Sequence, residues 1–315
     1  MMKTLITIGT RGSRLALWQA NWVKSAIVKH HPSLSIKLDI IKTKGDKILD
    51  VPLAKVGGKG LFVKEIEEAL LNGRIDLAVH SMKDMPAQIP EGLCIGAVPK
   101  REAPNDVLIS NNNLTMSSLP MGAKIGTSSL RRASQLLNMR PDITIMPLRG
   151  NLDTRIKKLE AHQFDAIVLA AAGVKRLGFE NKITEYIDLN TIIPAVGQGA
   201  LCIEIRKQDT DTHAIVSTLD HFETNRVIAC ERAFLIRLEG GCQVPMAAHG
   251  TIKEDKLTMS GLVGETDGSK MIKQTISGPV AEAEQIGTEL AGRLIDMGAG
   301  EILERLTLEL NKNEK

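Results

Sequence analysis

The sequence predicts an α/β protein made of two similar segments, followed by a smaller α+β segment. In the first two thirds of the chain, apolar runs alternate with amphipathic patterns. This is the order expected of largely parallel sheets with helices on both faces. From about residue 221, a helix precedes short strands and then further helical patterns, which indicates a separate α+β segment. Proline and glycine residues at 99–104 and 194–199 mark the breaks, and no internal repeat is visible.

The first segment begins with a strand at Leu5–Ile8. Ser13 is a typical helix N-cap, because its hydroxyl can accept a hydrogen bond from the first turn, and the helix extends to about His30 before Pro32. The elements expected after it are a strand at Ile36–Ile41, a glycine-rich stretch without periodicity at 42–60, an amphipathic helix at Leu61–Leu71 ended by Asn72-Gly73, and a strand at Ile75–Val79.

The second segment repeats the alternation. Its expected elements are strands at Val107–Ile109, Lys124–Gly126, Ile143–Met146 and Ala166–Leu169, with helices from about Ser129 and from Asn151. After Pro194 and the pair Gly197 and Gly199, the chain forms a strand at Leu201–Ile205. The C-terminal segment should contain a helix ending at Leu238, short strands around 247–278 with a turn at Asp267-Gly268, and helices from about Val280 to Leu310.

Composition excludes several classes of protein. The chain has 315 residues, 43% of them hydrophobic, which is ordinary for a globular protein. Its net charge of +3 and its two tryptophans, one tyrosine and five phenylalanines give no support for a nucleic-acid surface. The longest apolar stretch, Ala166–Val174, is far shorter than the roughly 20 residues that span a bilayer. Without an apolar signal core near the N-terminus, we expect a soluble, cytoplasmic protein without membrane contact.

Positive charge is concentrated in the first half of the chain. Residues 42–60 contain five lysines against two aspartates, and residues 124–155 contain one lysine and five arginines against two aspartates. From residue 222 onward, acidic residues outnumber basic ones. This distribution favours an anionic ligand bound by the first half.

Four scattered cysteines, without a CxxC pair, predict reduced thiols rather than a disulfide framework or a zinc ribbon. Cys94, Cys202 and Cys230 lie in apolar or helical patterns and are expected to be core residues. Cys242 differs, because GGCQVP places it between two glycines and a proline, where its thiol is unshielded. It is either a cysteine in a tight turn or a nucleophile or covalent anchor.

A second candidate site follows the strand Ile75–Val79. Ligands of open α/β sheets bind beyond the carboxyl ends of strands, and there the chain has His80, Lys83 and Asp84. The stiff loop could direct the Asp84 carboxylate at a ligand, or Lys83 and Asp84 could form a solvated pair. His80 by itself favours a structural, hydrogen-bonded role.

Three strand–helix junctions combine small residues with arginine. They are Arg11-Gly12-Ser13, GTSSLRR at 126–132, and Arg149-Gly150-Asn151 with Arg155 one turn later. Each could be a capped helix with surface arginines. Three together at strand ends, where helix amides are free and arginine is a bidentate donor, predict a ligand with several carboxylates or phosphates. A P-loop motif is absent, since GGKG at 57–60 lacks the following Ser or Thr.

Eight segments resemble the porphobilinogen deaminase (hydroxymethylbilane synthase) family over essentially the whole chain. They are GTRGSRLALWQ (9–19), KVGGKGLF (55–62), AVHSMKD (78–84), GTSSLRR (126–132), LRGNLDTR (148–155), AAAGVKRLG (170–178), PAVGQGAL (194–201) and ERAFLIRLEGGCQVP (231–245). The last segment is the most specific, because it resembles the cofactor-attachment signature of that family.

The resemblance implies two domains like those of type II periplasmic binding proteins, with a cleft between them, and a C-terminal α+β domain that carries the cysteine. The implied boundaries are 1–99 with 200–220 for domain 1, 100–199 for domain 2 and 221–315 for domain 3. It further implies a monomeric transferase of tetrapyrrole, and hence haem, biosynthesis. Such an enzyme joins four porphobilinogen molecules head to tail with loss of ammonia, and water then releases hydroxymethylbilane.

The site residues are carried over in the same way. The resemblance implies that Cys242 holds a dipyrromethane cofactor through a thioether, that Asp84 faces the pyrrole nitrogens, and that no metal is needed. The implied carboxylate-binding residues are Arg11, Ser13, Lys83, Ser129, Arg131, Arg132, Arg149, Arg155 and Arg176. Additional candidates are Gln19, Lys55, Lys59, Thr127, Ser128, Gly150 and Gln198. The alternative is a non-catalytic anion-binding module, against which the missing export signal and the cysteine turn argue.

Overall fold

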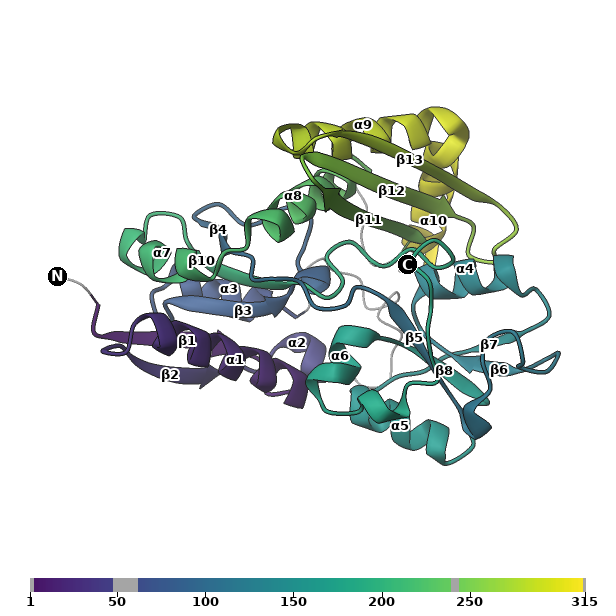
Figure 1. The fold of residues 1–315 in the computed structure, drawn as a ribbon, viewed down its shortest axis with the longest axis horizontal. Helices are drawn as coiled ribbons and strands as arrows, with labels where there is room; N and C mark the ends of the chain where they lie inside the picture. Colours follow the sequence, from purple (N-terminus) through teal and green to yellow (C-terminus); the bar gives the residue numbers. More distant parts are fainter. Residues whose placement is uncertain (1–2, 48–61, 239–243, 314–315) are drawn as a thin grey trace. The chain divides into compact units, whose positions relative to one another are not determined.

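The computed structural model describes residues 3–47, 62–238 and 244–313, whose elements are labelled in Figure 1. Contacts divide the chain into two compact units. The first unit combines the N-terminal residues up to Glu102 with Gly199–Asn225, and the second combines Ala103–Gln198 with Arg226–Lys315. The structure describes each unit by itself, so the predicted cleft and the three-domain boundaries stay predictions.

The first unit contains a five-stranded sheet in the order β2-β1-β3-β10-β4. Its strands are β1 (Leu5–Thr10), β2 (Ser35–Ile40), β3 (Leu77–Ser81), β4 (Leu93–Ala97) and β10 (Leu201–Arg206). Strands β2, β1 and β3 are parallel, whereas β10 is antiparallel to both β3 and β4. The sheet is therefore mixed, because β10 alone runs opposite to the other four strands.

Helices cover both faces of this sheet. Leu77 and Val79 of β3 pack in one cluster with α1 (Arg14–His30) and α7 (Thr210–Val216), whereas Ala78 packs in another with α3 (Lys64–Leu71). Since successive strand residues point to opposite faces, α1 and α7 lie on one face and α3 on the other. The short helix α2 (Lys44–Lys47) falls in the stretch 42–60 that was expected to lack regular structure.

The second unit contains a sheet of the same kind, in the order β7-β6-β8-β5-β9. Its strands are β5 (Asp106–Ser110), β6 (Lys124–Gly126), β7 (Thr144–Met146), β8 (Ala166–Ala170) and β9 (Glu185–Tyr186). Again three parallel strands are followed by two that alternate in direction. Helix α4 (Leu130–Met139) packs on one face, and α5 (Leu152–Glu160) and α6 (Ala171–Arg176) pack on the other. The two sheets thus share a topology that the sequence did not reveal as a repeat.

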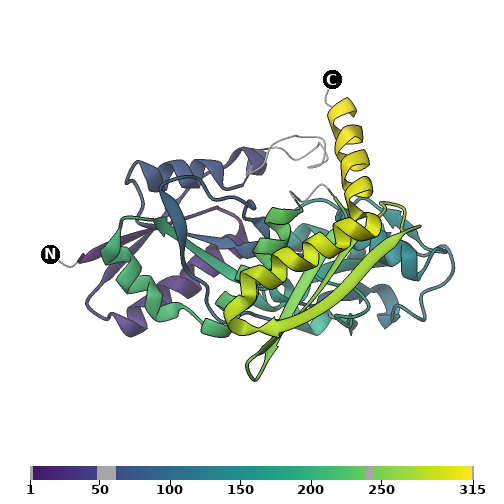
Figure 2. The same ribbon diagram turned by 90° about the horizontal axis from the view of Figure 1, so that it is seen from above.

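The rest of the second unit is an antiparallel sheet packed against helices. Its strands are β11 (Met246–Lys253), β12 (Lys256–Gly264) and β13 (Met271–Pro279), and its helices are α8 (Phe222–Arg237), α9 (Ala283–Leu294) and α10 (Gly300–Asn313). Figure 2 shows α9 lying along the strands. Phe234 of α8 and Leu290 of α9 are fully buried in the core that these helices form with the antiparallel sheet. A five-residue π-helix, Ile295–Ala299, separates α9 from α10.

The turn between β12 and β13 contacts helix α4. Asn138 donates a hydrogen bond to the Gly268 carbonyl at 2.8 Å, and the Ser134 hydroxyl donates to the Glu265 carbonyl. Gly268 has φ +76°, and a Cβ there would lie 2.6 Å from the Asn138 backbone nitrogen. Only glycine allows this approach of backbone to backbone, which joins the antiparallel sheet to the helix whose first turn contains Arg131 and Arg132.

Replacing Gly268 with alanine should therefore destabilise the second unit. Gly122 is the matched control, since it has φ +75° but nothing within 4 Å of the position of a Cβ. Both substitutions incur the cost of a left-handed backbone, and only Gly268→Ala adds a collision of about 1–3 kcal/mol. Thermal unfolding of the two variants measures the difference. Equal transition temperatures would show that the contact with α4 adjusts to the added Cβ without loss of stability.

Candidate functional site

In the first unit, the candidate residues lie beyond two adjacent parallel strands. Strand β1 ends at Thr10, directly before Arg11 and Ser13, and β3 ends at Ser81, directly before a turn of 3₁₀ helix at Met82–Asp84. Because β1 and β3 pair in parallel, their carboxyl ends meet at one edge of the sheet. Ser13 is the N-cap of α1, as predicted, and its hydroxyl accepts a hydrogen bond from the Ala16 amide at 3.3 Å.

These side chains line a small hollow of about 50 Å³. Arg11, Ser13, Gln19 and Asp84 all contribute to its wall, together with Ser81. The buried Gln19 amide donates to the Ser81 hydroxyl at 2.9 Å, which holds the end of β3 against α1. Asp84 is exposed, and among the described residues no side chain donates a hydrogen bond to its carboxylate. The hollow therefore combines a cation, two hydroxyls, an amide and an accessible carboxylate.

Arg11 is held by two neighbours that the sequence did not indicate. Its Nε donates to Asp46 Oδ1 at 3.1 Å, and its guanidinium carbon lies 4.2 Å from the centroid of the Phe62 ring. Burial raises the pKa of Asp46, but hydrogen bonds from Arg11 and Thr43 outweigh it, so that this pKa lies below its ordinary value. Arg11 is thus oriented by a carboxylate and an aromatic face before any ligand binds.

In the second unit, the ends of β6, β7 and β8 meet in the same way. Thr127, Ser128 and Ser129 follow β6, and all three hydroxyls make local hydrogen bonds. Ser129 caps α4 by accepting from the Arg132 amide at 3.4 Å, and Thr127 accepts from the Ser129 amide at 3.2 Å. The Ser128 hydroxyl bridges to Leu148, which follows β7. The predicted N-cap is confirmed, and these contacts fix the geometry of the junction.

Two guanidinium groups are buried against one carboxylate at the start of β5. Arg131 and Arg132 are each 6% exposed, and Asp106 is fully buried. Arg131 Nη1 lies 2.8 Å from Asp106 Oδ2, Arg132 Nη2 lies 2.7 Å from Oδ1, and the Gln198 amide donates to the same carboxylate at 2.9 Å. Burial raises the pKa of Asp106, but the two guanidinium charges hold it far below its ordinary value. The three charged groups sum to one positive charge.

Arg149 and Gly150 lie just beyond β7, and Arg155 follows in the first turns of α5. Asn151 caps α5 by accepting from the Thr154 amide at 3.1 Å, and Arg155 Nε donates to the Gly150 carbonyl at 2.8 Å. Gly150 has φ +108°, and a Cβ there would lie 2.8 Å from the Thr154 side chain, so this position needs glycine. Arg176 ends α6, the helix that follows β8, and like Arg149 and Arg155 it is half-buried.

Cys242 lies outside the described residues, as do Lys55 and Lys59, and only the flanks of the cysteine segment can be described. Leu238 and Val244 on either side of it are buried in the C-terminal core. Glu231, the first residue of the ERAFLIRLEGGCQVP segment, is fully buried and accepts hydrogen bonds from the amides of Gly197 at 2.7 Å and Gly250 at 3.0 Å. Glu231 thus ties α8 to the PAVGQGAL segment and to β11.

The other three cysteines fit the prediction that they are packing residues. Cys202 and Cys230 are fully buried, and Cys94 is partly buried. Burial and the neighbouring Glu231 raise the pKa of Cys230 to about 12, so its thiol is not ionised at neutral pH.

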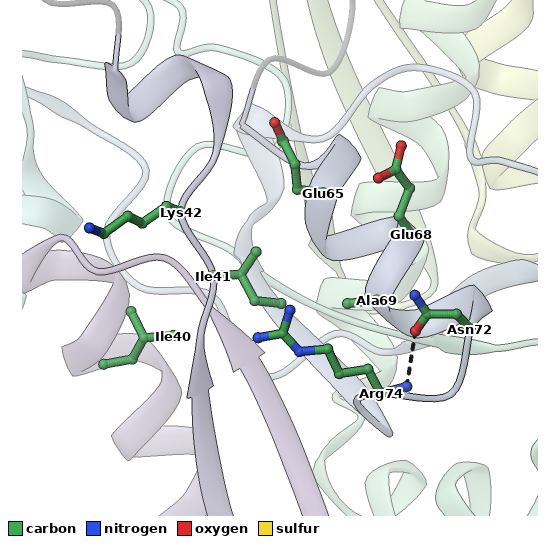
Figure 3. A pocket seen from close by; sticks show the side chains of 8 residues that line it. All are labelled: Ile40, Ile41, Lys42, Glu65, Glu68, Ala69, Asn72 and Arg74. Carbon is green, nitrogen blue, oxygen red and sulfur yellow. Dashed lines mark hydrogen bonds between the residues drawn. The ribbon is translucent and has the colours of Figure 1, made fainter.

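A larger hollow of about 320 Å³ lies elsewhere in the first unit (Figure 3). Glu65, Glu68, Lys42 and Arg74 contribute two negative and two positive charges to its wall. The Arg74 guanidinium is paired with Asp39 at 2.7 Å. None of the predicted site residues lines this hollow, and its balanced charge does not favour an anion, so the smaller hollow at the strand ends remains the candidate site.

Sequence reasoning missed several charged partners, above all Asp46, Asp106 and Glu204. Glu204 was passed over because it lies inside the predicted strand Leu201–Ile205, and Asp106 because it directly precedes the predicted strand Val107–Ile109. A buried carboxylate must have a cationic or hydrogen-bonding partner. The signal that could have found Asp106 was its position next to an apolar run, and the structure buries all five residues of DVLIS.

Comparison with known protein families shows to which family the chain belongs. The family model described as "Porphobilinogen deaminase, dipyromethane cofactor binding domain" matches residues 6–214, and the one described as "Porphobilinogen deaminase, C-terminal domain" matches residues 226–296. The chain belongs to the porphobilinogen deaminase family. The resemblance seen in the sequence motifs is thereby confirmed.

Porphobilinogen deaminases of several bacteria are similar to the chain over nearly their whole length. That of Syntrophotalea carbinolica is 54% identical over 308 residues, which is 98% of each chain. That of Geobacter sulfurreducens is 54% identical and covers 95% of this chain and 93% of its own. That of Carboxydothermus hydrogenoformans is 52% identical and covers 99% of this chain and 100% of its own. The chain is a transferase with the hydroxymethylbilane synthase function of this family.

Solved structures add a distant likeness of fold. A periplasmic domain of BvgS from Bordetella pertussis has a TM-score of 0.40 at 12% identity, covering 69% of this chain and 86% of its own. An arginine-specific periplasmic binding protein from Salmonella typhimurium has a TM-score of 0.40 at 14% identity, covering 72% and 94%. Likenesses of this size say nothing about ligands. The predicted fold class is confirmed by the two α/β sheets and the small C-terminal α+β part.

Members of the deaminase family bind a dipyrromethane cofactor, as the description of the first matching domain states. The residues present fit such a group, because its acetate and propionate side chains need cations and hydrogen-bond donors. At the strand ends of the second unit, two buried guanidinium groups face a single carboxylate. In the first unit, Asp84 offers an acceptor that no described side chain occupies.

Within the described residues, no helix is long and apolar enough to cross a membrane.

Proposed function

We propose that this deaminase binds its cofactor and substrate at the two sets of strand ends, with Cys242 as the covalent anchor. The observation that carries the proposal is the convergence of the candidate residues at the carboxyl ends of parallel strands in each unit. Five of the eight deaminase motifs, at 9–19, 78–84, 126–132, 148–155 and 170–178, lie at those ends. Attached to Cys242 through a thioether, the dipyrromethane would supply the pyrrole carbon to which the first porphobilinogen is joined.

In this proposal the cationic residues bind carboxylates. Arg149, Arg155 and Arg176 lie half-buried at the strand ends of the second unit, where arginine can hold a carboxylate through two parallel hydrogen bonds. Arg131 and Arg132 already bind Asp106, so they supply a fixed positive field and their remaining donors. In the first unit, the proposed carboxylate contacts are Arg11, Ser13 and Lys83, with Gln19 nearby.

Asp84 is proposed to act by charge. When ammonia leaves porphobilinogen, positive charge develops on the methylene carbon and is shared with the ring nitrogen. A carboxylate held beside that N–H stabilises the charge, in the way that fixed donors stabilise an oxyanion. Asp84 suits this role because it lies in a hollow and is not engaged by another described side chain. The same carboxylate would serve at every addition, since each one passes through the same charge.

The anchor is tested by the mass of the intact protein. We expect purified protein to be heavier than its sequence by two pyrrole units, with the excess on the peptide that contains Cys242. Cys242→Ser should fold, because exchanging sulfur for oxygen changes the side-chain volume little, but it should lack the adduct and the activity. Cys94→Ser is the matched control, since Cys94 is a partly buried thiol outside the site.

An active protein whose mass equals that of its sequence would contradict the proposed anchor. So would an adduct that stays on Cys242→Ser. A protein that binds porphobilinogen carboxylates without releasing ammonia would instead support the anion-binding module. We further propose that the protein is cytoplasmic and monomeric and has no nucleic-acid or membrane partner. Sedimentation of the purified enzyme at its working concentration would test the monomeric state.

A further inference from the structure

Three titratable side chains are buried together between the first sheet and helix α3. His80 belongs to β3, Glu204 to β10 and Glu67 to α3. They are 5%, 0% and 7% exposed. His80 Nε2 lies 3.1 Å from Glu204 Oε2. In the antiparallel register Cys202 faces His80 and Glu204 faces Ala78, so His80 and Glu204 are diagonal neighbours on the face that α3 covers.

This cluster holds more acid than it can ionise. If both carboxyl groups were charged and His80 were neutral, two negative charges would be buried with no cation among them. Glu67 Oε1 and Glu204 Oε1 are both buried without a hydrogen-bond partner. Burial, and next to it the charge of Glu204, raises the pKa of Glu67 to about 7. Glu67 is therefore partly protonated at neutral pH.

Within residues 3–47, 62–238 and 244–313, the other charged groups near α3 do not supply the missing cation. The adjacent Glu68 adds negative charge, and Cys94 of β4 is a thiol whose pKa burial raises. Arg206 of β10 donates instead to the Leu70 and Ile75 carbonyls and pairs with Asp209. Among the described residues, His80 is thus the one basic side chain that bonds to Glu204, and its charge also acts on Glu67.

The cluster reaches the candidate site through His80. The same residue that bonds to Glu204 also lines the hollow, next to Ser81 and in the same wall as Asp84. On its other side, Glu204 and Glu67 are sealed from solvent by α3. A proton that enters or leaves this cluster from the hollow must therefore pass His80.

We propose that His80, Glu204 and Glu67 form a proton store for the reaction beside Asp84, with His80 as its opening. The proposal rests on the deaminase function proposed above. In each addition, the C–N bond of porphobilinogen breaks and ammonia leaves with the electron pair. After the new C–C bond forms, the C–H bond at the acceptor carbon breaks and its electron pair restores the ring. The store gives a proton to the amine before the C–N bond breaks, so that the leaving group is ammonia. It then takes back the proton released from the acceptor carbon, so the cluster ends each cycle unchanged.

The rate test uses Glu67→Gln, which has the shape of the protonated acid but cannot exchange a proton. We expect kcat at pH 7 to fall about tenfold while KM stays within about twofold, because general acid–base assistance acts on the chemical step and not on carboxylate binding. In wild type we expect kcat to change with pH near 7, where Glu67 gains or loses its proton, and in Glu67→Gln this change should be absent. Glu68→Gln removes a charge from the same helix at an exposed position. It should keep the change in kcat near pH 7, moved only slightly to lower pH by the loss of negative charge next to Glu67.

A readout without catalysis keeps this proposal separate from the function itself. Infrared difference spectra of wild type between pH 6 and pH 8 should show a carboxylic-acid band that Glu67→Gln lacks and Glu68→Gln keeps. An active wild type without this band, or a Glu67→Gln variant with an unaltered pH profile, would overturn the proton store alone. A wild type with no deaminase activity would overturn the proposed function and the store with it.

Discussion

Replacing Asp106 with asparagine should cost the second unit about 3–5 kcal/mol of stability, because it leaves buried charge without its partner. Arg131 and Arg132 are each 6% exposed and both bind the Asp106 carboxylate, so the variant holds two buried guanidinium groups against a neutral amide. Thermal or urea unfolding measures the loss. Glu289→Gln, which breaks the exposed pair with Arg293 in the same unit, is the control and should cost no more than about 0.5 kcal/mol.

The pH dependence of that loss has a definite sign. The folded-state pKa of Asp106 is depressed, so its contribution to stability is present above the unfolded pKa near 4 and is lost as pH falls through the lower folded value. The gap between Asp106→Asn and wild type should thus be constant from about pH 5 upward. The gap should narrow progressively as the pH falls below about 4. A variant as stable as wild type at pH 7 would show that Arg131 and Arg132 find other partners.

Asp84 should show the largest effect on activity. Asp84→Asn keeps the size of the side chain and removes its charge, whereas Asp84→Glu keeps the charge and displaces it by about one methylene. If the charge acts on the developing cation, Asn should lose about 3 kcal/mol of transition-state stabilisation, a factor of roughly 100, relative to Glu. Single-turnover rates on protein that carries its cofactor give this comparison, with adduct content measured alongside because cofactor assembly uses the same chemistry.

Glu91→Gln provides the matched control, since it removes an exposed carboxylate from the same connection between β3 and β4. It should leave the rate within about twofold of wild type. Equal activity of the Asn and Glu variants of Asp84 would remove this carboxylate from the mechanism. Deficient activity in Glu91→Gln would show instead that the loop responds to its total charge.

Local signals predicted the elements well. Ser13, Ser129 and Asn151 were expected to begin helices, and each is the observed N-cap with a side chain that accepts from the first turn. Such caps depend on residues within four positions of one another, so a single sequence contains the whole interaction. The sheets were harder, because β10 joins the first sheet as an antiparallel strand from a distant part of the chain. Pairing of that range leaves no local pattern.

In the candidate site, too, local features could be predicted and long-range contacts could not. The strand-end rule placed Arg11, Arg149 and Asp84 correctly at sheet edges, since it needs only the order of strands and loops. The roles of Arg131 and Arg132 could not be read in this way. Their partner Asp106 precedes them by about 25 residues on another strand, and nothing short of the folded sheet shows which carboxylate they meet. Ligand roles for these arginines stay predictions.

The position of β10 has a consequence for the way the protein is made. This strand lies between β3 and β4 in the first sheet, although the whole sheet of the second unit is encoded between β4 and β10. A ribosome therefore releases all five strands of the second sheet before the strand that completes the first. The N-terminal half must wait with β3 and β4 unjoined, their edges open to wrong pairing. The sheet whose synthesis begins first can thus be completed only after all strands of the second sheet have been made.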